Sequence, residues 1–261
     1  MTVSVERPED GIAVVTYDNP PVNAVSATMM SEITGVFEQL GDDRSVRAVI
    51  FTGGGERVFM AGADLKAAQG GQAADGTPPA SKATDTGRDA RNAFWAVYDC
   101  DVPVIAAVNG PALGAGFVFA SVCDFIVAAE HARFGLTEIN VGLLGGAAFM
   151  QRLLGPGRTR KMFLTGRQAP AQEFFELGVV DAVVPMAQLR DKALELAREL
   201  AAKSPIAMRL AKESLNRIEG ESLKDAYRTE QDYTHRLRQF EDSAEAMRAF
   251  VEKRAPEWHW R

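Results

Sequence analysis

VNGPALGAGFVFASVCDFIVAA, Val108 to Ala129, contains the strand-to-helix connection on which the fold depends. An apolar strand, Val104 to Val108, ends at the turn Asn109-Gly110-Pro111, and an apolar helix begins at Gly114-Ala115-Gly116. Small residues at such a connection expose backbone N–H groups that the helix leaves without partners. These groups lie at the positive end of the helix dipole and suit a phosphate or a developing oxyanion. Close helix packing explains a lone Gly-x-Gly equally well.

A second glycine-rich connection favours ligand binding by the N–H groups over close helix packing. Val58 to Lys66, VFMAGADLK, follows a predicted strand, Arg47 to Thr52, and the turn Gly53-Gly54-Gly55. Two such connections can direct two N–H donors at one oxygen, which is what an oxyanion hole requires. A binder of a single phosphate needs only one, so the pair favours an oxyanion hole.

The composition sets limits on the class of protein. The 261 residues are 46% hydrophobic, enough for a packed core, and the net charge of −6 argues against a general nucleic-acid or membrane-surface binder. No apolar run reaches the roughly 18 residues of a membrane span. Cys100 and Cys123 have no metal-binding spacing and are expected to be buried thiols in a reducing compartment. We therefore expect a cytoplasmic protein.

Strands alternate with helical stretches along the first two thirds of the chain. Such alternation implies crossover connections and a largely parallel sheet, which is an α/β fold. The predicted elements before the tail are a hairpin of Thr2 to Glu6 with Ile12 to Tyr17, a helix from Ser26 to about Gly41, strands at Arg47 to Thr52, Asp124 to Ala128 and Val179 to Val184, and a helix from Ala147 closed by Gly155-Pro156-Gly157.

The tail is predicted to be helical. Apolar residues recur at helical spacing in four segments, Leu189 to Leu200, Ile206 to Leu215, Ala226 to Leu237 and Asp242 to Lys253. We therefore divide the chain into a core of residues 1–185, which holds the site, and a helical region of residues 186–261. Apolar stripes left over in this region favour subunit contacts.

One long segment lacks large apolar residues. Gly70 to Gly87, GGQAADGTPPASKATDTG, is rich in Gly, Ala, Thr and Pro and is predicted to be a long loop, because the apolar pattern resumes at Phe94. Beside a site, such a loop can serve as a lid or a substrate-facing wall. A surface loop without a role is an equally good interpretation.

Glu138 is the acidic residue that stands out. It follows an apolar strand and is flanked by Leu136 and Ile139, and a carboxylate in apolar surroundings can act as a general base or acid near neutral pH. His131, His235 and His259 lie in contexts typical of surface or packing residues. The sequence contains no nucleophile elbow, HExxH, Walker A or paired-Cys pattern, which disfavours serine hydrolysis and metal-assisted chemistry.

The chain resembles the crotonase, or enoyl-CoA hydratase/isomerase, superfamily over almost its whole length. No single motif is decisive, but their order and spacing together are specific. The matching segments are NPPVNAVS at Asn19 to Ser26, VFMAGADL at Val58 to Leu65, VNGPALGAG at Val108 to Gly116, CDFIVAA at Cys123 to Ala129, FGLTEINVGLL at Phe134 to Leu144, LTGRQAPAQEFFELGVVDAVVP at Leu164 to Pro185, and AFVEKR at Ala249 to Arg254.

The resemblance implies a spiral of β-β-α units with a C-terminal helical trimerisation region, as a homotrimer or a dimer of trimers. It implies that the N–H groups of Ala63 and Ala115, the latter after Gly114, hold a thioester carbonyl oxygen. Backbone carbonyls of Ala61 and Ala63, in the motif that continues with Asp64 and Leu65, hold the adenine of CoA. Lys253 matches a lysine that reaches a neighbouring subunit's CoA phosphate. CoA enters as part of the acyl-CoA substrate, and no separate cofactor, metal, nucleic acid or membrane is implied.

The chain departs from the hydratase pattern at one decisive position. Related hydratases use two glutamates, and the position of the first is Val118 here, while Glu138 matches the second. Hydration needs one group that removes a proton from water and another that supplies a proton to the α-carbon. Single-glutamate isomerases of this superfamily instead move one proton between two carbons of an enoyl thioester. Phe149 and Met150 replace small residues of the hydratase pattern, which suggests a reshaped, drier acyl pocket.

We therefore expect double-bond isomerisation with Glu138 as the acid and base. A hydratase or lyase that acts through Glu138, with help from Asp75 or Asp85, is the second interpretation. A catalytically inert acyl-CoA binder is the third, because Val118 already removes one acid.

Overall fold

The fold centres on a twisted sheet. The structure, a computed structural model, describes residues 2–62, 85 and 87–261. Strand order in the sheet is β1 (Thr2–Glu9), β2 (Ile12–Asp18), β3 (Ala48–Gly53), β4 (Val104–Val108), β6 (Phe125–Ala129) and β9 (Ala182–Val184). The β1–β2 pair is antiparallel and each later pair is parallel, which confirms the predicted hairpin and parallel sheet.

Strand β9 is shorter than predicted. It begins at Ala182, because the N–H groups of Val179 and Val180 donate to the carbonyl of Phe174 at the end of α7 (Ala171–Glu176) and are used in that turn.

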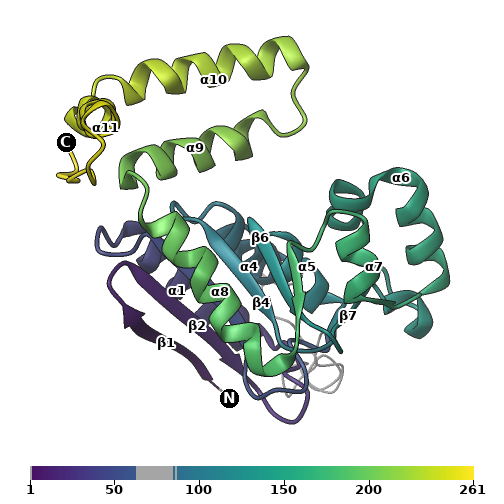
Figure 1. Cartoon of the computed structure of the whole chain (residues 1–261). Helices are drawn as coiled ribbons and strands as arrows, with labels where there is room; N and C mark the ends of the chain where they lie inside the picture. The colour runs from purple at the N-terminus through teal and green to yellow at the C-terminus, as the bar shows by residue number, and fades with distance from the viewer. Residues whose placement is uncertain (1, 63–84, 86) are drawn as a thin grey trace.

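Helices cover both faces of the sheet because successive strand residues point to opposite sides. Val15 and Phe51 pack towards α1 (Ala27–Asp42), whereas Val14 and Ile50 pack towards α8 (Met186–Ala201). The two helices lie on opposite faces in Figure 1. As predicted, Ser26 caps α1, where its side chain accepts a hydrogen bond from the N–H of Met29.

A smaller sheet lies beside the main one and carries the elements of the site. It joins β5 (Ala112–Leu113), β7 (Arg133–Gly135) and β8 (Ala169–Pro170). Around it lie α4 (Arg88–Tyr98), α5 (Ala115–Ser121), the 3₁₀ turn η1 (Glu138–Val141) and α6 (Ala147–Thr165). The predicted end of helix α6 at Gly155-Pro156-Gly157 is wrong. The backbone leaves the helical conformation at Gly155, with φ 71° and ψ 171°, but helical turns resume and continue to Thr165.

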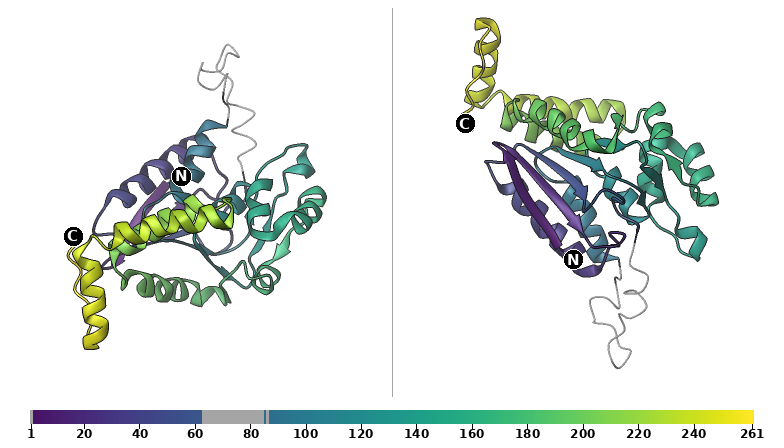
Figure 2. Two further views of the ribbon diagram at one scale, coloured as in Figure 1. Left: turned by 90° about the horizontal axis from the view of Figure 1, so that it is seen from above. Right: turned by 60° about the horizontal axis from the view of Figure 1, so that its bottom comes forward.

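The predicted C-terminal helices are all present. They are α8, α9 (Pro205–Ile218), α10 (Leu223–Leu237) and α11 (Glu241–Glu252). Helix α8 shares its apolar core with the sheet, whereas α10 and α11 extend away from the sheet (Figures 1 and 2). The division between residues 185 and 186 stays a prediction. No described helix combines the length and apolar composition needed to cross a bilayer.

A buried lysine fastens α9 to the core. The Lys212 side chain is 5% exposed, and its Nζ donates to the carbonyl of Val102 at 3.1 Å and to Oδ2 of Asp124 at 2.8 Å. The same Asp124 oxygen accepts a hydrogen bond from the N–H of Val104 at the start of β4. These contacts fix the base of the helical tail against the strand that leads to α5.

We expect Lys212→Met to lower the free energy of unfolding by about 3 kcal/mol, because it leaves the Asp124 carboxylate without its cation. Lys192→Met is the matched control, since Lys192 pairs with Glu195 on the surface and its loss costs less than about 1 kcal/mol. Urea unfolding measures both. Equal stabilities of the two variants would contradict the role assigned to Lys212.

Candidate active site

The two glycine-rich connections lie side by side. Met60 forms a parallel bridge with Ala112, and the N–H of Leu113 donates to the carbonyl of Met60 at 2.9 Å. Further along, a Cβ on Gly114 would lie 3.4 Å from the Cα of Gly62. The chain after β3 therefore reaches the start of α5, as far as Gly62.

Two asparagine side chains hold these connections together. Asn109, 1% exposed, donates to the carbonyls of Gly53 at 2.9 Å and Gly55 at 2.7 Å and accepts from the N–H of Gly53. Asn23 donates to the carbonyls of Gly54 and Val58. Neither asparagine was among the predicted site residues. The signal was present in part, because Asn109 directly follows a buried strand and can bond to a neighbouring backbone.

Close backbone approach explains the glycine at the start of α5. A Cβ on Gly116 would lie 2.3 Å from the carbonyl oxygen of Met60, closer than real contacts allow. The packing interpretation of the Gly-x-Gly pattern therefore holds for Gly116. Gly114 serves a different need, because its φ of 56° and ψ of −121° suit glycine and its Cβ position faces Glu138.

The backbone N–H of Ala115 is available for a ligand. Ala115 is the first residue of α5, so the helix offers this N–H no carbonyl. Within the described part of the chain, no backbone or side-chain oxygen accepts a hydrogen bond from it. The second predicted donor, Ala63, lies outside the described residues, as do Asp64 and Leu65.

Glu138 lies directly against this helix start. It opens η1, and a Cβ placed on Gly114 or on Gly145 would lie 2.9 Å or 3.1 Å from its Oε1. The two glycines thus leave room for the carboxylate. Its Oε2 is buried and has no hydrogen-bond partner among the described residues. The structure therefore brings together Glu138, Gly114 and Ala115, three of the predicted site residues.

Burial raises the pKa of Glu138 above its ordinary value of 4.5, although hydrogen bonds from its own and Thr137's backbone oppose the shift. Burial disfavours the charged form, and among the described residues no cation pairs with this carboxylate. A carboxylate with these properties is a stronger base than one in water and can exchange a proton with a carbon acid.

Val118 lies one turn further along α5 and is 3% exposed. A Cβ on Gly146 would lie 2.8 Å from its Cγ2, and equally close to a methyl carbon of Leu136. The position that the resemblance matches to a hydratase glutamate is thus an apolar contact between α5 and the start of α6.

The structure also describes three other predicted site residues, Ala61, Phe149 and Lys253. Ala61 is half-buried, and its N–H donates to the carbonyl of Val22. Lys253 is exposed at the end of α11, at the opposite end of the molecule from α6 (Figure 1). Phe149 contacts Phe94 and Trp95 on α4. The structure therefore does not bring Lys253 to Glu138 within one chain.

Of the two predicted auxiliary acids, only Asp85 lies among the described residues. Asp85 pairs with Arg91, and this hydrogen bond lowers the pKa of Asp85. Asp75 and most of the Gly70 to Gly87 loop lie outside the described residues. The described residues contain no group of His, Cys, Asp and Glu side chains that could hold a metal ion.

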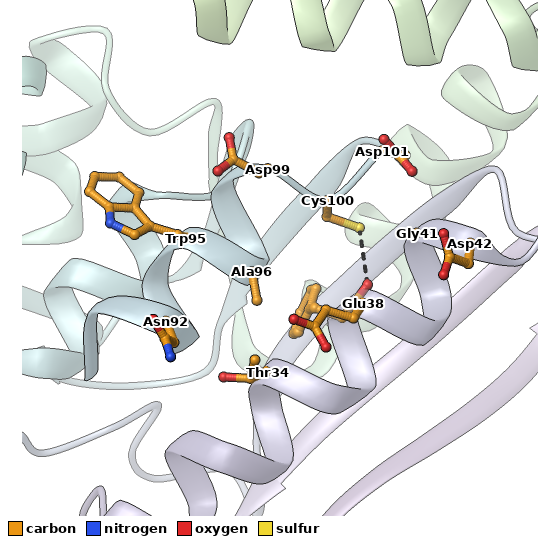
Figure 3. A pocket seen from close by; sticks show the side chains of 11 residues that line it. Thr34, Glu38, Gly41, Asp42, Asn92, Trp95, Ala96, Asp99, Cys100 and Asp101 are labelled. Carbon is orange, nitrogen blue, oxygen red and sulfur yellow. Dashed lines mark hydrogen bonds between the residues drawn. The ribbon is translucent and has the colours of Figure 1, made fainter. Parts of the chain in front are cut away.

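A cavity of about 620 Å³ between α1 and α4 is separate from this site. Figure 3 shows acidic side chains along it, Glu38, Asp42, Asp99 and Asp101, and none of the predicted site residues. Cys100 lines it, with Sγ 3.8 Å from the carbonyl of Phe37. Cys100 and Cys123 are both free and buried, as predicted.

Comparison with known proteins decides the family. Residues 7–261 match the family model described as enoyl-CoA hydratase/isomerase. The chain belongs to this family. Among curated relatives, carnitinyl-CoA dehydratase of Citrobacter koseri is 38% identical, with 95% of this chain and 94% of the relative aligned. That of Salmonella enteritidis is 37% identical over the full length of both chains.

Solved structures agree with this assignment. An enoyl-CoA hydratase from Bacillus anthracis has a TM-score of 0.91 at 33% identity and covers 99% of both chains. An enoyl-CoA hydratase from Mycobacterium smegmatis has a TM-score of 0.88 at 30% identity and covers 98% of both. The predicted crotonase-like α/β fold is confirmed, and this member of the enoyl-CoA hydratase/isomerase family is an acyl-CoA enzyme.

Proposed function

We propose that this enzyme shifts the double bond of a β,γ-enoyl-CoA into conjugation with the thioester, using Glu138 as its acid and base. Three observations carry the proposal. Among the described residues, Oε2 of Glu138 is buried without a hydrogen-bond partner, and the N–H of Ala115 is free. The Glu138 carboxylate lies against Gly114, the residue before Ala115, and Val118 lies where the resemblance places a second carboxylate. One carboxylate and a polarised carbonyl are sufficient for this reaction.

The thioester oxygen accepts hydrogen bonds from the N–H groups of Ala115 and Ala63. Each such donor stabilises the developing enolate by about 3 kcal/mol. The Glu138 carboxylate removes a proton from Cα, and the electron pair moves into an enolate. The carbonyl reforms as the double bond shifts, and Glu138 returns the proton to Cγ. Atoms and charge balance without water or any other reactant.

The remaining family roles belong to the same proposal. The adenine of CoA is held by backbone carbonyls of Ala61 and Ala63 beside Asp64 and Leu65, and CoA enters only as part of the substrate, with no separate cofactor. Lys253 binds a CoA phosphate of a neighbouring subunit in a homotrimer or dimer of trimers. An exposed apolar face on α11 supports such assembly, since Met247, Phe250 and Val251 are 62%, 85% and 78% exposed.

A second candidate is reversible dehydration of a 3-hydroxyacyl-CoA through Glu138. The similarity to carnitinyl-CoA dehydratases favours it. Val118 argues against dehydration, because an apolar side chain cannot bind or deliver the water involved.

One experiment separates these reactions. The purified enzyme is mixed with a 3-enoyl-CoA, a 2-enoyl-CoA or a 3-hydroxyacyl-CoA, and absorbance of the conjugated thioester is followed. We expect conjugation to appear from the 3-enoyl-CoA, while the 2-enoyl-CoA stays conjugated.

Loss of conjugation from the 2-enoyl-CoA, or its appearance from the 3-hydroxyacyl-CoA, would replace the isomerase assignment with the dehydratase. No change with any substrate, together with retained acyl-CoA binding in a calorimetric titration, would indicate an inert binder.

A further inference from the structure

An aromatic cavity of about 540 Å³ opens between α4 and α6. Ligand pockets commonly have volumes of this order. Its lining is formed by Phe94, Trp95 and Tyr98 of α4 and Phe149 of α6, together with Ala148, Arg91, Arg152, Glu219 and Gly220.

The rings of this cavity pack on one another. Phe149 lies 5.8 Å from Phe94 and 5.7 Å from Trp95 between ring centroids, and Trp95 lies 5.7 Å from Tyr98. Trp95 also lines the acidic cavity between α1 and α4, so its side chain borders both cavities (Figure 3). The four rings thus form one continuous apolar wall.

Neighbouring residues of α5 and α6 link this wall to the candidate active site. Gly145 borders the Glu138 carboxylate, Gly146 contacts Val118, and α6 begins at the next residue. Phe149 is three residues beyond Gly146, a rise of about 5 Å along a helix. On the other side, Phe119 follows Val118 and its ring lies 4.8 Å from that of Phe94.

The charged groups at the rim are already paired. Arg152 donates to Oε1 of Glu219 at 2.5 Å and to the carbonyl of Ser121, and its guanidinium lies 5.2 Å from the Tyr98 ring centroid. Tyr98 donates to the other Glu219 oxygen at 2.6 Å. Arg91 pairs with Asp85. Because each guanidinium is paired with a carboxylate, these rim charges balance one another and favour an uncharged guest.

We propose that this cavity receives the distal part of the acyl group, so that the substrates are enoyl-CoA thioesters with a long, uncharged hydrocarbon chain. The inference rests on the proposed function, because it assumes that the thioester lies between Ala115 and Glu138. It assigns Phe94, Trp95, Phe149 and Ala148 to chain-length selection, a role separate from the proton transfer.

Filling the cavity tests this assignment. Ala148 is exposed on the first turn of α6, so Ala148→Phe places a ring into the space without disturbing the core. We expect the ratio of kcat/KM for a ten-carbon to that for a four-carbon 3-enoyl-CoA to fall at least about tenfold, the order expected when two buried methylene groups lose their contacts. Ala27→Phe, on the exposed first turn of α1, is the control and leaves the ratio unchanged.

A second readout does not depend on turnover. Binding of saturated ten-carbon and four-carbon acyl-CoAs is measured by calorimetry for wild type, Ala148→Phe and Phe149→Ala. If both variants reduce the preference for the longer chain, the result supports binding of the acyl chain in this cavity. If no isomerisation is found as well, only the proposed function fails. An unchanged preference in Ala148→Phe, or tighter binding of a matched chain ending in a trimethylammonium group, would overturn the inference.

Discussion

Glu138→Gln is expected to lower kcat/KM for a 3-enoyl-CoA by about 10³-fold, within the range that positioned acid–base groups contribute. Glutamine keeps the shape of the side chain beside Gly114 and Gly145 but cannot take up a proton. Binding of a saturated acyl-CoA should therefore persist. Glu130→Gln, an exposed change directly after β6, is the matched control and should leave kcat/KM within about twofold, as for other surface substitutions.

The same variant makes a prediction about stability. Because burial raises the folded-state pKa of Glu138 above 4.5, the stability associated with this group is fully present below pH 4.5 and is lost as pH rises through the folded-state pKa. At pH 8 the buried charge is unfavourable, so Glu138→Gln should unfold at a temperature equal to or above that of wild type. A variant that loses activity and also melts well below wild type at pH 8 would show that Glu138 has a structural role instead.

Gly114→Ala is expected to lower kcat/KM by about 100-fold, the cost of moving a reacting group by about 1 Å. The new Cβ would lie 2.9 Å from Oε1 and 3.3 Å from Cδ of Glu138, so the carboxylate must move. The positive φ adds about 1–3 kcal/mol of destabilisation, which thermal unfolding would measure.

Alanine substitutions at two other glycines distinguish the effect of backbone strain from that of moving the Glu138 carboxylate. Gly178 has φ of 73° and nothing within 4 Å of its Cβ position, so Gly178→Ala also places a side chain at positive φ but makes no contact in the site. Gly35 lies in α1 with open space around its Cβ position, and Gly35→Ala should be neutral or stabilising by up to about 1 kcal/mol. If Gly178→Ala lost as much activity as Gly114→Ala, strain and not the position of Glu138 would explain the loss.

The sequence predicted the elements well because their local signals agree with their packing. Ser26 and the apolar spacing of α1 point to the same helix, and the apolar strands before each glycine-rich turn pair in parallel as expected. The pairing of Glu138 with the α5 start needed the resemblance as well, since Gly114 and Glu138 are distant in the chain. The contact between them depends on β5 pairing with β7, which no local pattern specifies.

Other features depend on packing between distant segments. Phe149 was expected to reshape an acyl pocket, but only the structure shows its contacts with α4, because no periodicity within α6 identifies the partner helix. The hydrogen bonds of Asn109 to the Gly53 to Gly55 turn likewise join residues far apart in sequence. The Lys212–Asp124 pair could not be predicted either, because an isolated lysine on an amphipathic helix is usually exposed.

Exchange of the Cα hydrogens of a saturated acyl-CoA with deuterium from solvent, followed by proton NMR, tests the central claim most directly. A saturated chain cannot isomerise or gain water, so exchange reports only whether the enzyme makes the enolate and which group removes the proton. We predict that wild type exchanges these hydrogens and that Glu138→Gln, binding the same thioester, does so at least about 100-fold more slowly. Equal exchange by the two proteins, or none by wild type with the thioester bound, would contradict the account.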